Sequence, residues 1–256
     1  MNVHRKLLPQ ERETLILQAL GAGMRTITEL SEELSVSEAT VRRDLDSLDS
    51  QGKVRRVHGG AMRVKFPRTE PVFDEKSALH AIEKKHIAEK AIEYIEDGDT
   101  IYLDGGSTMA SLAKLLGRRS NLTVVTNSLI AASELMESTH KIILVGGEFR
   151  SLSRTMVGPL TARIIESLRI NKAFMGTIGF TVEDGISTTD PNEAYTKETV
   201  MKRAEKVFLL ADSSKIGTPS FVVSGTTSDI DVLITDSGIP AEAIRALKKK
   251  KVEIVV

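Results

Sequence analysis

Residues 34–45 of the chain read LSVSEATVRRDL, and residues 53–61 read KVRRVHGGA. In the first stretch, Ser37 is a residue type that caps helix N-termini with its side-chain oxygen. Apolar side chains then recur at the spacing of one helical face, namely Val41, Leu45 and Leu48. This pattern predicts a helix from Ser37 to about Gln51, ended by glycine. The second stretch has β-branched and basic residues running into Gly-Gly, which predicts a strand and a hairpin turn.

Two shorter helices are expected before this one. The first begins near Pro9, which a first helical turn tolerates, and stops at Gly21 and Gly23. The second runs from about Thr28 to Ser35. Their apolar side chains are spaced to share one core with the third helix, and they are Leu15, Ile16, Ala19, Leu20, Ile27, Leu30 and Leu34. Three short helices followed by a hairpin are typical of a winged helix-turn-helix.

The outer face of the third predicted helix carries small polar and basic side chains. At about 100° per residue, Ala39 and Arg43 point away from the apolar stripe, with Thr40 and Arg42 on its flanks. Such side chains suit reading of the DNA major groove, where arginine pairs with guanine or clamps phosphate. An isolated arginine pair more often belongs to a solvated helix face. The short helix before it and the hairpin after it favour DNA recognition here.

Positive charge is concentrated in the same region. The whole chain is balanced, with 35 basic and 35 acidic side chains, but residues 39–65 hold seven basic against three acidic. A basic, glycine-rich wing can approach the DNA backbone and supply salt-sensitive affinity. The alternative interpretation is an ordinary surface hairpin.

These two stretches resemble the DeoR family of bacterial transcriptional regulators. The resemblance rests on residues 34–45 and on Val57 to Ala61; in that family the first run forms the recognition helix and His-Gly-Gly belongs to the wing. Together with the pattern above, it gives a DNA-contacting set of Ser37, Ala39, Thr40, Arg42, Arg43, Arg55, Arg56, His58 and Gly59. Asp44 is unfavourable beside phosphate, so we expect it to make an internal contact.

The remaining residues predict a second, larger domain. A chain of 256 residues fits a small domain plus a medium one. Two prolines favour an extended connector, which gives domains at 1–65 and 77–256 joined by residues 66–76. No apolar run is long enough to span a membrane and the first ten residues lack a signal-peptide stretch, so we expect a cytoplasmic protein. With no cysteine and five scattered histidines, we expect no metal and no cofactor.

Seven short β-rich runs, most of them separated by helical segments, follow a helix expected over about residues 77–96. They are Thr100–Leu103, Leu122–Thr126, Lys141–Val145, Lys172–Met175, Val207–Ala211, Val232–Thr235 and Val252–Val256. This rhythm predicts an α/β domain with a mainly parallel, doubly wound sheet, in which ligands bind beyond the carboxyl ends of the strands. No dinucleotide-binding or P-loop signature follows any of the runs.

Several of these carboxyl-end loops carry glycines, small polar residues or a lysine. Gly105-Gly106 allows close backbone approach, while Ser107 and Thr108 offer hydroxyls at a helix start, where phosphate binds. Lys215 can complete a phosphate site, and Asp212 can accept hydrogen bonds from sugar hydroxyls. The expected effector-binding set is Asp104, Gly105, Gly106, Ser107, Thr108, Asn127, Gly146, Gly147, Asp212 and Lys215. The alternatives are a simple helix cap at Ser107 and a solvated lysine in a surface turn.

The same loops resemble the effector domain of the DeoR family, so the resemblance extends over nearly the whole chain. That domain is similar in fold to ribose-5-phosphate isomerase and glucosamine-6-phosphate deaminase. The resemblance implies a repressor of a carbohydrate-metabolism operon that binds double-stranded operator DNA and a phosphorylated sugar or polyol. The effector is expected to lower its affinity for DNA. One DNA-reading module alone buries little surface, so we expect a homodimer or homotetramer.

An isomerase-like enzyme fused to a DNA-binding module is the main alternative. Sugar isomerisation needs a positioned base. The isomerases that this domain resembles carry acidic residues in the segment after the fourth strand, whereas residues 174–180 of this chain read FMGTIGF and offer no acid. Glu193 and Lys197 can pair as base and cation, although an ordinary surface salt bridge at this spacing is the favoured interpretation. We therefore expect no enzymatic activity. An RNA-binding protein is disfavoured because no RNA module is recognisable and few aromatic residues are present for base stacking.

Overall fold

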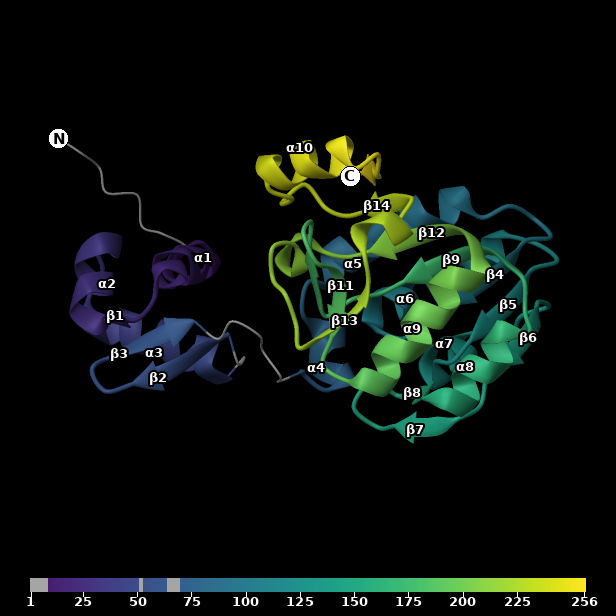
Figure 1. The fold of residues 1–256 in the computed structure, drawn as a ribbon, viewed down its shortest axis with the longest axis horizontal. Helices are drawn as coiled ribbons and strands as arrows, with labels where there is room; N and C mark the ends of the chain where they lie inside the picture. The colour runs from purple at the N-terminus through teal and green to yellow at the C-terminus, as the bar shows by residue number, and fades with distance from the viewer. Residues whose placement is uncertain (1–8, 51–52, 64–69) are drawn as a thin grey trace. The chain divides into compact units, whose positions relative to one another are not determined.

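The chain folds into two compact units, residues 1–70 and 71–256, each with its own hydrophobic core (Figure 1). The structure, a computed structural model, describes residues 9–50, 53–63 and 70–256. Within these ranges no helix is both long enough and apolar enough to cross a membrane.

The smaller unit has three helices and a three-stranded antiparallel sheet in the order β1-β3-β2. Its elements are α1 (Pro9–Ala19), β1 (Arg25–Thr26), α2 (Ile27–Leu34), α3 (Glu38–Ser50), β2 (Val54–Val57) and β3 (Gly60–Arg63). Helix α2 begins with a capping box, in which Thr26 and Glu29 satisfy each other's backbone N–H groups. Helix α3 begins after Ser37, whose hydroxyl accepts the backbone N–H of Thr40 at 3.3 Å. The predicted winged helix-turn-helix is confirmed.

The core of this unit is formed by the apolar faces that the sequence predicts, with one exception. Fully buried side chains come from all three helices, including Ile16, Leu30, Val41, Leu45 and Leu48. Leu15 is 37% exposed, so its assignment to the core was wrong. It lies one position before Ile16, which takes the inward direction on α1.

A buried ion pair joins α1 to α3. Arg12 donates from Nε and Nη2 to the two carboxylate oxygens of Asp44, at 2.7 and 2.9 Å. The side chains are only 14% and 11% exposed. The hydrogen bond with Asp44 raises the pKa of Arg12 above its usual value. The expected internal contact of Asp44 is confirmed. This contact holds α3 against α1.

The larger unit is built on seven strands that are all parallel, in the order β15-β14-β12-β9-β4-β5-β6. The strands are β4 (Thr100–Leu103), β5 (Thr123–Thr126), β6 (Lys141–Leu144), β9 (Ile170–Met175), β12 (Ala204–Leu210), β14 (Val232–Ile234) and β15 (Glu253–Val255). All seven predicted runs form strands, with ends shifted by a few residues. The predicted doubly wound α/β class is therefore confirmed.

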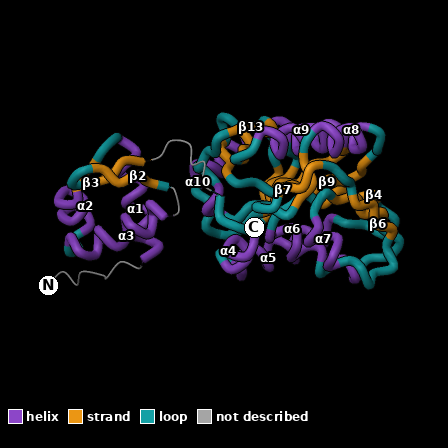
Figure 2. Tube along the Cα trace, turned by 90° about the horizontal axis from the view of Figure 1, so that it is seen from below, coloured by secondary structure: helices purple, strands orange, loops and turns teal. Residues whose placement is uncertain are grey.

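Helices cover both faces of this sheet (Figure 2). The helices are α4 (Phe73–Ala78), α5 (Ala81–Ala91), α6 (Ser107–Ala113), α7 (Leu129–Glu134), α8 (Pro159–Glu166), α9 (Pro191–Arg203) and α10 (Ala241–Lys249). The side chains of α5, α6 and α7 pack in one buried cluster, and those of α8, α9 and α10 pack with the cluster on the opposite face. Because β5 and β6 extend the sheet on one side of β4 and β9 extends it on the other, the strand order reverses between β4 and β9.

Two features of the larger unit differ from the expectation. The helix expected over residues 77–96 is divided, because His80 adopts a left-handed conformation (φ 53°) between α4 and α5. Helix α4 moreover begins inside the stretch expected to be an extended connector. Two small antiparallel sheets were not predicted: β7 (Glu148–Arg150) with β8 (Thr155–Val157), and β10 (Gly179–Thr181), β11 (Gly185–Thr188) and β13 (Val222–Gly225). Their strands are too short for an alternation pattern to be visible.

We predict that Asp44→Ala lowers the free energy of unfolding of the smaller unit by about 1–3 kcal/mol, because it leaves the Arg12 guanidinium half-enclosed without its carboxylate. Denaturant unfolding followed by circular dichroism measures the change. Asp44→Asn retains a hydrogen-bond acceptor and serves as the matched control, with a smaller loss. Equal stability of the wild type and Asp44→Ala would show that the pair contributes nothing net.

Candidate functional site

The outward face of α3 presents the side chains expected to read DNA. Ala39, Arg42 and Arg43 are exposed, and Thr40 is half-buried. The Ser37 and Thr40 hydroxyls lie 2.9 Å apart and hydrogen-bond each other. Arg42 donates to Glu38 at 3.0 Å, a pair whose members are both about half exposed, so solvent or a phosphate can displace it at little cost. The geometry therefore leaves Arg42 and Arg43 available for a ligand on this face.

The hairpin between β2 and β3 forms the wing. Gly59 has φ +76°, a left-handed conformation that favours glycine, and the backbone there is exposed together with His58. A side chain at Gly60 would collide with the carbonyl oxygen of Arg25, so the strand pairing of β1 with β3 depends on this glycine. The two glycines thus have different roles: one shapes the tip and the other seats the wing on the unit.

The two wing arginines differ in their surroundings. Arg55 is exposed and lies free to meet a phosphate, since no side chain or carbonyl of the described residues pairs with it. Arg56 donates to the Asp46 carboxylate at 2.9 Å, and its backbone N–H donates to Asp49 at 3.1 Å. Asp46 and Asp49 both belong to α3, so Arg56 fixes the wing against the recognition helix. The sequence alone did not distinguish these two roles.

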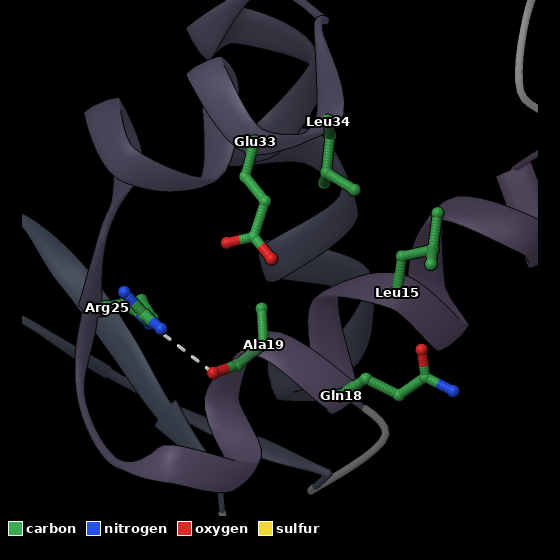
Figure 3. A pocket seen from close by; sticks show the side chains of 6 residues that line it. All are labelled: Leu15, Gln18, Ala19, Arg25, Glu33 and Leu34. Carbon is green, nitrogen blue, oxygen red and sulfur yellow. Dashed lines mark hydrogen bonds between the residues drawn. The ribbon is translucent and has the colours of Figure 1, made fainter.

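A shallow hollow lies elsewhere on this unit (Figure 3). Its cavity volume is about 420 Å³, and it is lined by Leu15, Gln18, Ala19, Arg25, Glu33 and Leu34. Arg25 donates to the main-chain carbonyl of Ala19 at 3.4 Å across one side. The exposed Leu15 is one of its lining residues. The hollow includes none of the α3 side chains that are expected to read DNA.

In the larger unit, the reversal of strand order between β4 and β9 places the ends of these strands at a crevice where α/β proteins bind ligands. Asp104 follows β4 and accepts the backbone N–H of Gly176, which follows β9, at 2.9 Å. Lys197 of α9 donates to the same carboxylate and, at 3.0 Å, to the Gly176 carbonyl. Asp104 and Lys197 are 2% and 3% exposed. This buried ion pair therefore ties α9 to the carboxyl ends of β4 and β9.

Glu193 and Lys197 form no ordinary surface salt bridge, contrary to the favoured interpretation. Their charged atoms lie 3.8 Å apart, but both side chains are buried. The Glu193 carboxylate also accepts the Thr188 hydroxyl at 3.0 Å and lies 3.5 Å from Arg150. Since each of these groups is occupied by internal partners, the arrangement holds α9 to the sheet and does not present a free base.

Two further polar side chains come from neighbouring strands of the sheet, Tyr102 in β4 and Asn127 directly after β5. The Tyr102 hydroxyl and the Asn127 Oδ1 are buried and have no hydrogen-bond partner among the residues that the structure describes. Burial raises the pKa of Tyr102 well above its usual value, and the charges of Asp104 and Glu193 raise it further. Tyr102 is thus a neutral donor next to two carboxylates. Asn127 remains a predicted effector contact.

A cluster of cations lies at the other predicted part of the site. The Ser107 hydroxyl and the Lys84 ammonium both donate to the main-chain carbonyl of Lys76, so the two donors are neighbours. Lys84 also donates to the Leu79 carbonyl. Burial lowers the pKa of Lys84 to about 8, while the Asp212 charge opposes the shift and the Lys215 charge adds to it.

The loop after β12 carries the two residues whose charges act on Lys84, Asp212 and Lys215. Lys215 is half-buried there, and its ammonium has no hydrogen-bond or ion-pair partner in the described part of the chain. Asp212 is buried and accepts from the backbone N–H and the hydroxyl of Ser214. Ser107, Asp212 and Lys215 therefore follow parallel strands whose carboxyl ends lie at the same edge of the sheet, with only β9 between β4 and β12. Lys84 was not predicted, because a lysine within a charged helix gives no sequence signal of burial.

The glycines of the expected effector site have packing roles that sequence could not reveal. A Cβ on Gly105 would collide with Thr155, and one on Gly147 would collide with Thr161 of α8. Gly106 has φ +117° and open space around it. Gly146 and Gly147 follow the edge strand β6, four strand spacings or roughly 19 Å from the loop after β12. The structure does not bring these two glycines together with Lys215, and Thr108 is half-buried on α6.

A helix-turn-helix with a basic wing, followed by a separate α/β unit with polar residues after the carboxyl ends of its strands, defines a DNA-binding transcriptional regulator. Two family models match the chain: the DeoR-like helix-turn-helix domain over residues 12–65 and the DeoR C terminal sensor domain over residues 79–237. The chain belongs to the DeoR family of transcriptional regulators. The resemblance seen in the sequence is confirmed, and the protein is a regulator rather than an enzyme.

Similar proteins cover nearly the whole chain. An uncharacterized HTH-type transcriptional regulator, YulB of Bacillus subtilis, is 37% identical over 252 residues, covering 97% of this chain and 96% of its own. The lactose phosphotransferase system repressor of Streptococcus mutans is 37% identical over 218 residues, covering 84% and 86%. Among solved structures, a D-ribose-5-phosphate isomerase in complex with phospho-erythronic acid covers 52% of each chain, with 22% identity and a TM-score of 0.39, too low to carry an argument.

We predict that Arg43→Ala weakens binding to the specific duplex by about 1–3 kcal/mol and leaves non-specific binding nearly unchanged. Arg55→Ala should instead weaken both and reduce the salt slope by about one. Arg56→Ala should loosen the wing and lower the unfolding temperature as well. The measurement is fluorescence anisotropy with a duplex selected in vitro by the full chain and with a random duplex. Arg163→Ala, an exposed cation on α8, is the control; unchanged specific binding by Arg43→Ala contradicts the assignment.

Proposed function

We propose that this regulator represses a carbohydrate-metabolism operon and that a phosphorylated sugar or polyol lowers its affinity for operator DNA. The observation that carries the proposal is that Lys84 and the Ser107 hydroxyl share the Lys76 carbonyl, and that Lys215, after β12, follows a parallel strand whose carboxyl end lies at the same edge of the sheet as that of β4, before Ser107. Two ammonium groups and a hydroxyl meet the needs of a phosphate dianion. The name of the lactose phosphotransferase system repressor supports a carbohydrate context.

The rest of such a ligand has polar partners along the crevice. Asp212 offers a carboxylate for sugar hydroxyls near the cations, and Asp104 lies two strands away, after β4. Tyr102 and Asn127 supply one donor and one acceptor whose hydrogen-bonding capacity the described residues leave unused. Orientation by a few placed polar groups is how small-molecule sites achieve specificity. We infer that the phosphate lies at Lys84 and Lys215 and that the polyol chain extends towards Asp104.

The effect on DNA follows from linkage. A ligand shifts the DNA-bound population only through different affinities for the free and DNA-bound forms, so effector and operator weaken each other's binding by the same factor. An isomerase would instead convert the ligand with time. Internal pairing of Glu193 and Lys197 supports the sensor over the enzyme.

We predict that Lys215→Ala weakens binding of a responsive sugar phosphate by roughly 10- to 100-fold, through loss of a charge-assisted hydrogen bond. DNA affinity without the ligand should be nearly unchanged, giving a poorly inducible regulator. Calorimetry with the sugar phosphate and with its unphosphorylated sugar measures this. Lys206→Ala, a half-exposed lysine on β12 before the loop, is the control. Equal affinities for the two sugars would falsify the phosphate site.

We predict that affinity for the sugar phosphate falls as pH rises through about 8. Lys84 binds phosphate as a cation, and its lowered pKa of about 8 means that it loses its proton there. The bound anion raises that pKa, so binding takes up a proton and affinity falls by at most about tenfold per pH unit. Lys84→Gln should bind weakly with no such dependence. Titrations from about pH 7 to 9.5, above the second ionisation of phosphate, decide this; a wild-type profile as flat as that of Lys84→Gln argues against Lys84.

We further propose that the working form is at least a dimer, so that two copies of α3 read paired half-sites. A single small module rarely buries enough surface for tight specific binding. Light scattering should give a mass of at least twice 28.0 kDa, both free and on DNA. A single 28.0 kDa species under both conditions would count decisively against it.

A further inference from the structure

Helix α10 ends in a dense group of cations. Arg245 and Lys248 to Lys251, here called the α10 basic cluster, place five basic side chains within seven residues, without an acidic residue between them. All five are exposed. The cluster belongs to the larger unit and lies outside both the recognition helix and the effector loops. Neither of those sites explains it.

The cluster is held on a rigid support. Leu247 and Val252 are buried in the core on either side of the last turn. The Val252 N–H donates to the Leu247 carbonyl at 3.2 Å, and the Lys251 N–H donates to the Lys248 carbonyl at 3.1 Å. These two bonds form a Schellman motif, which ends a helix with one residue in the left-handed conformation. The cations therefore project from a fixed turn.

The left-handed position of this motif is occupied by Lys251, with φ 63°. Glycine is the usual residue there, because a side chain is strained in that conformation. The chain thus carries a lysine at a position where glycine would stabilise the helix end better. A benefit other than folding stability accounts for that choice.

Interaction with the helix dipole does not account for the whole cluster. One or two cations in the last turn satisfy the carbonyl end of a helix, and Lys248 and Lys249 already lie there. Across residues 9–50, 53–63 and 70–256, none of the five side chains forms a hydrogen bond or an ion pair. Their charges are uncompensated by the fold.

The rest of the larger unit carries more acidic than basic side chains. Residues 71–256 hold 23 basic and 25 acidic side chains, and without the cluster the same range holds 18 basic against 25 acidic. An acidic unit repels DNA, whereas the cluster reverses the local sign on one exposed turn. Basic side chains that are this close in sequence and have no internal ion pairs are suited to binding a surface of dense negative charge.

We propose that the α10 basic cluster binds the phosphate backbone of double-stranded DNA outside the sequence that α3 reads. Duplex DNA carries one negative charge per 1.7 Å of axis, and lysines contact it as flexible point charges without reading bases. DNA is already the partner of this regulator. Binding of an acidic protein partner usually involves apolar side chains beside the charges. The large apolar residues of this turn, Leu247 and Val252, are buried and offer no such contact. The contact adds affinity that is independent of sequence and sensitive to salt.

The test compares two quadruple variants of the full chain. One changes Lys248, Lys249, Lys250 and Lys251 to Gln, and the control changes four exposed lysines elsewhere on the unit, Lys85, Lys114, Lys141 and Lys202, to Gln. Both lose the same net charge. On a random duplex of about 60 bp, the first variant should flatten the slope of log K against log salt by about 2–4, and the control by less than about one. Equal slopes for the two variants overturn the proposal.

A second comparison locates the contact. On a duplex trimmed to the selected binding sequence, the wild type and the first variant should bind alike, and they should diverge when flanks of about 20 bp are added. Lys251→Gly should raise the unfolding temperature yet weaken binding to the flanked duplex, which a purely structural role does not predict. If the first variant changes only the self-association measured by light scattering, the cluster joins copies of the chain and the proposal fails.

Discussion

The reversal of strand order between β4 and β9 is the constraint on which the larger unit depends. Because all seven strands are parallel, their carboxyl ends lie at one edge of the sheet. At the reversal, the chain segments that follow β4 and β9 leave towards opposite faces of the sheet. Polar backbone at this edge must find partners. Asp104, after β4, accepts the N–H of Gly176, and Lys197, on α9, donates to the Gly176 carbonyl and to the Asp104 carboxylate. Removing either partner would leave a buried charge alone, which is far costlier than losing the pair as a whole.

The sequence predicted what depends on periodicity and local chemistry. Alternating β-rich and helical runs gave all seven strands of the main sheet, and the apolar stripe of α3 gave its outward face. It failed where a long-range partner decides the outcome. Leu15 competes with Ile16 for one inward direction, and only the packed unit shows which of them wins. The left-handed turn at His80 interrupts a stretch that contains neither proline nor glycine, in a place where Lys84 donates to the preceding carbonyls of Lys76 and Leu79.

The functional residues divide in the same way. Ser107, Asp212 and Lys215 were recognisable because they follow strands, whereas Lys84 lies inside a helix and acquires its role from what packs over it. Arg55 and Arg56 are adjacent and chemically identical, yet Asp46 and Asp49 of α3 hold one and leave the other exposed. Charge counts along a sequence say nothing about such pairing. For Glu193 and Lys197 the sequence favoured a surface salt bridge, because four-residue spacing is common on exposed helix faces, but both side chains are buried.

The two carbonyls to which Lys84 donates belong to Lys76 of α4 and to Leu79, the residue that ends this helix, and α4 is the first helix of the larger unit. An ammonium group has three protons to share. The Lys76 and Leu79 carbonyls take two of these protons, which leaves one for a phosphate, and a phosphate that accepts a second proton must displace one of the carbonyls. The hydroxyl of Ser107 donates to the Lys76 carbonyl as well. Binding of a phosphate at this site and the anchoring of α4 therefore both depend on the Lys84 ammonium.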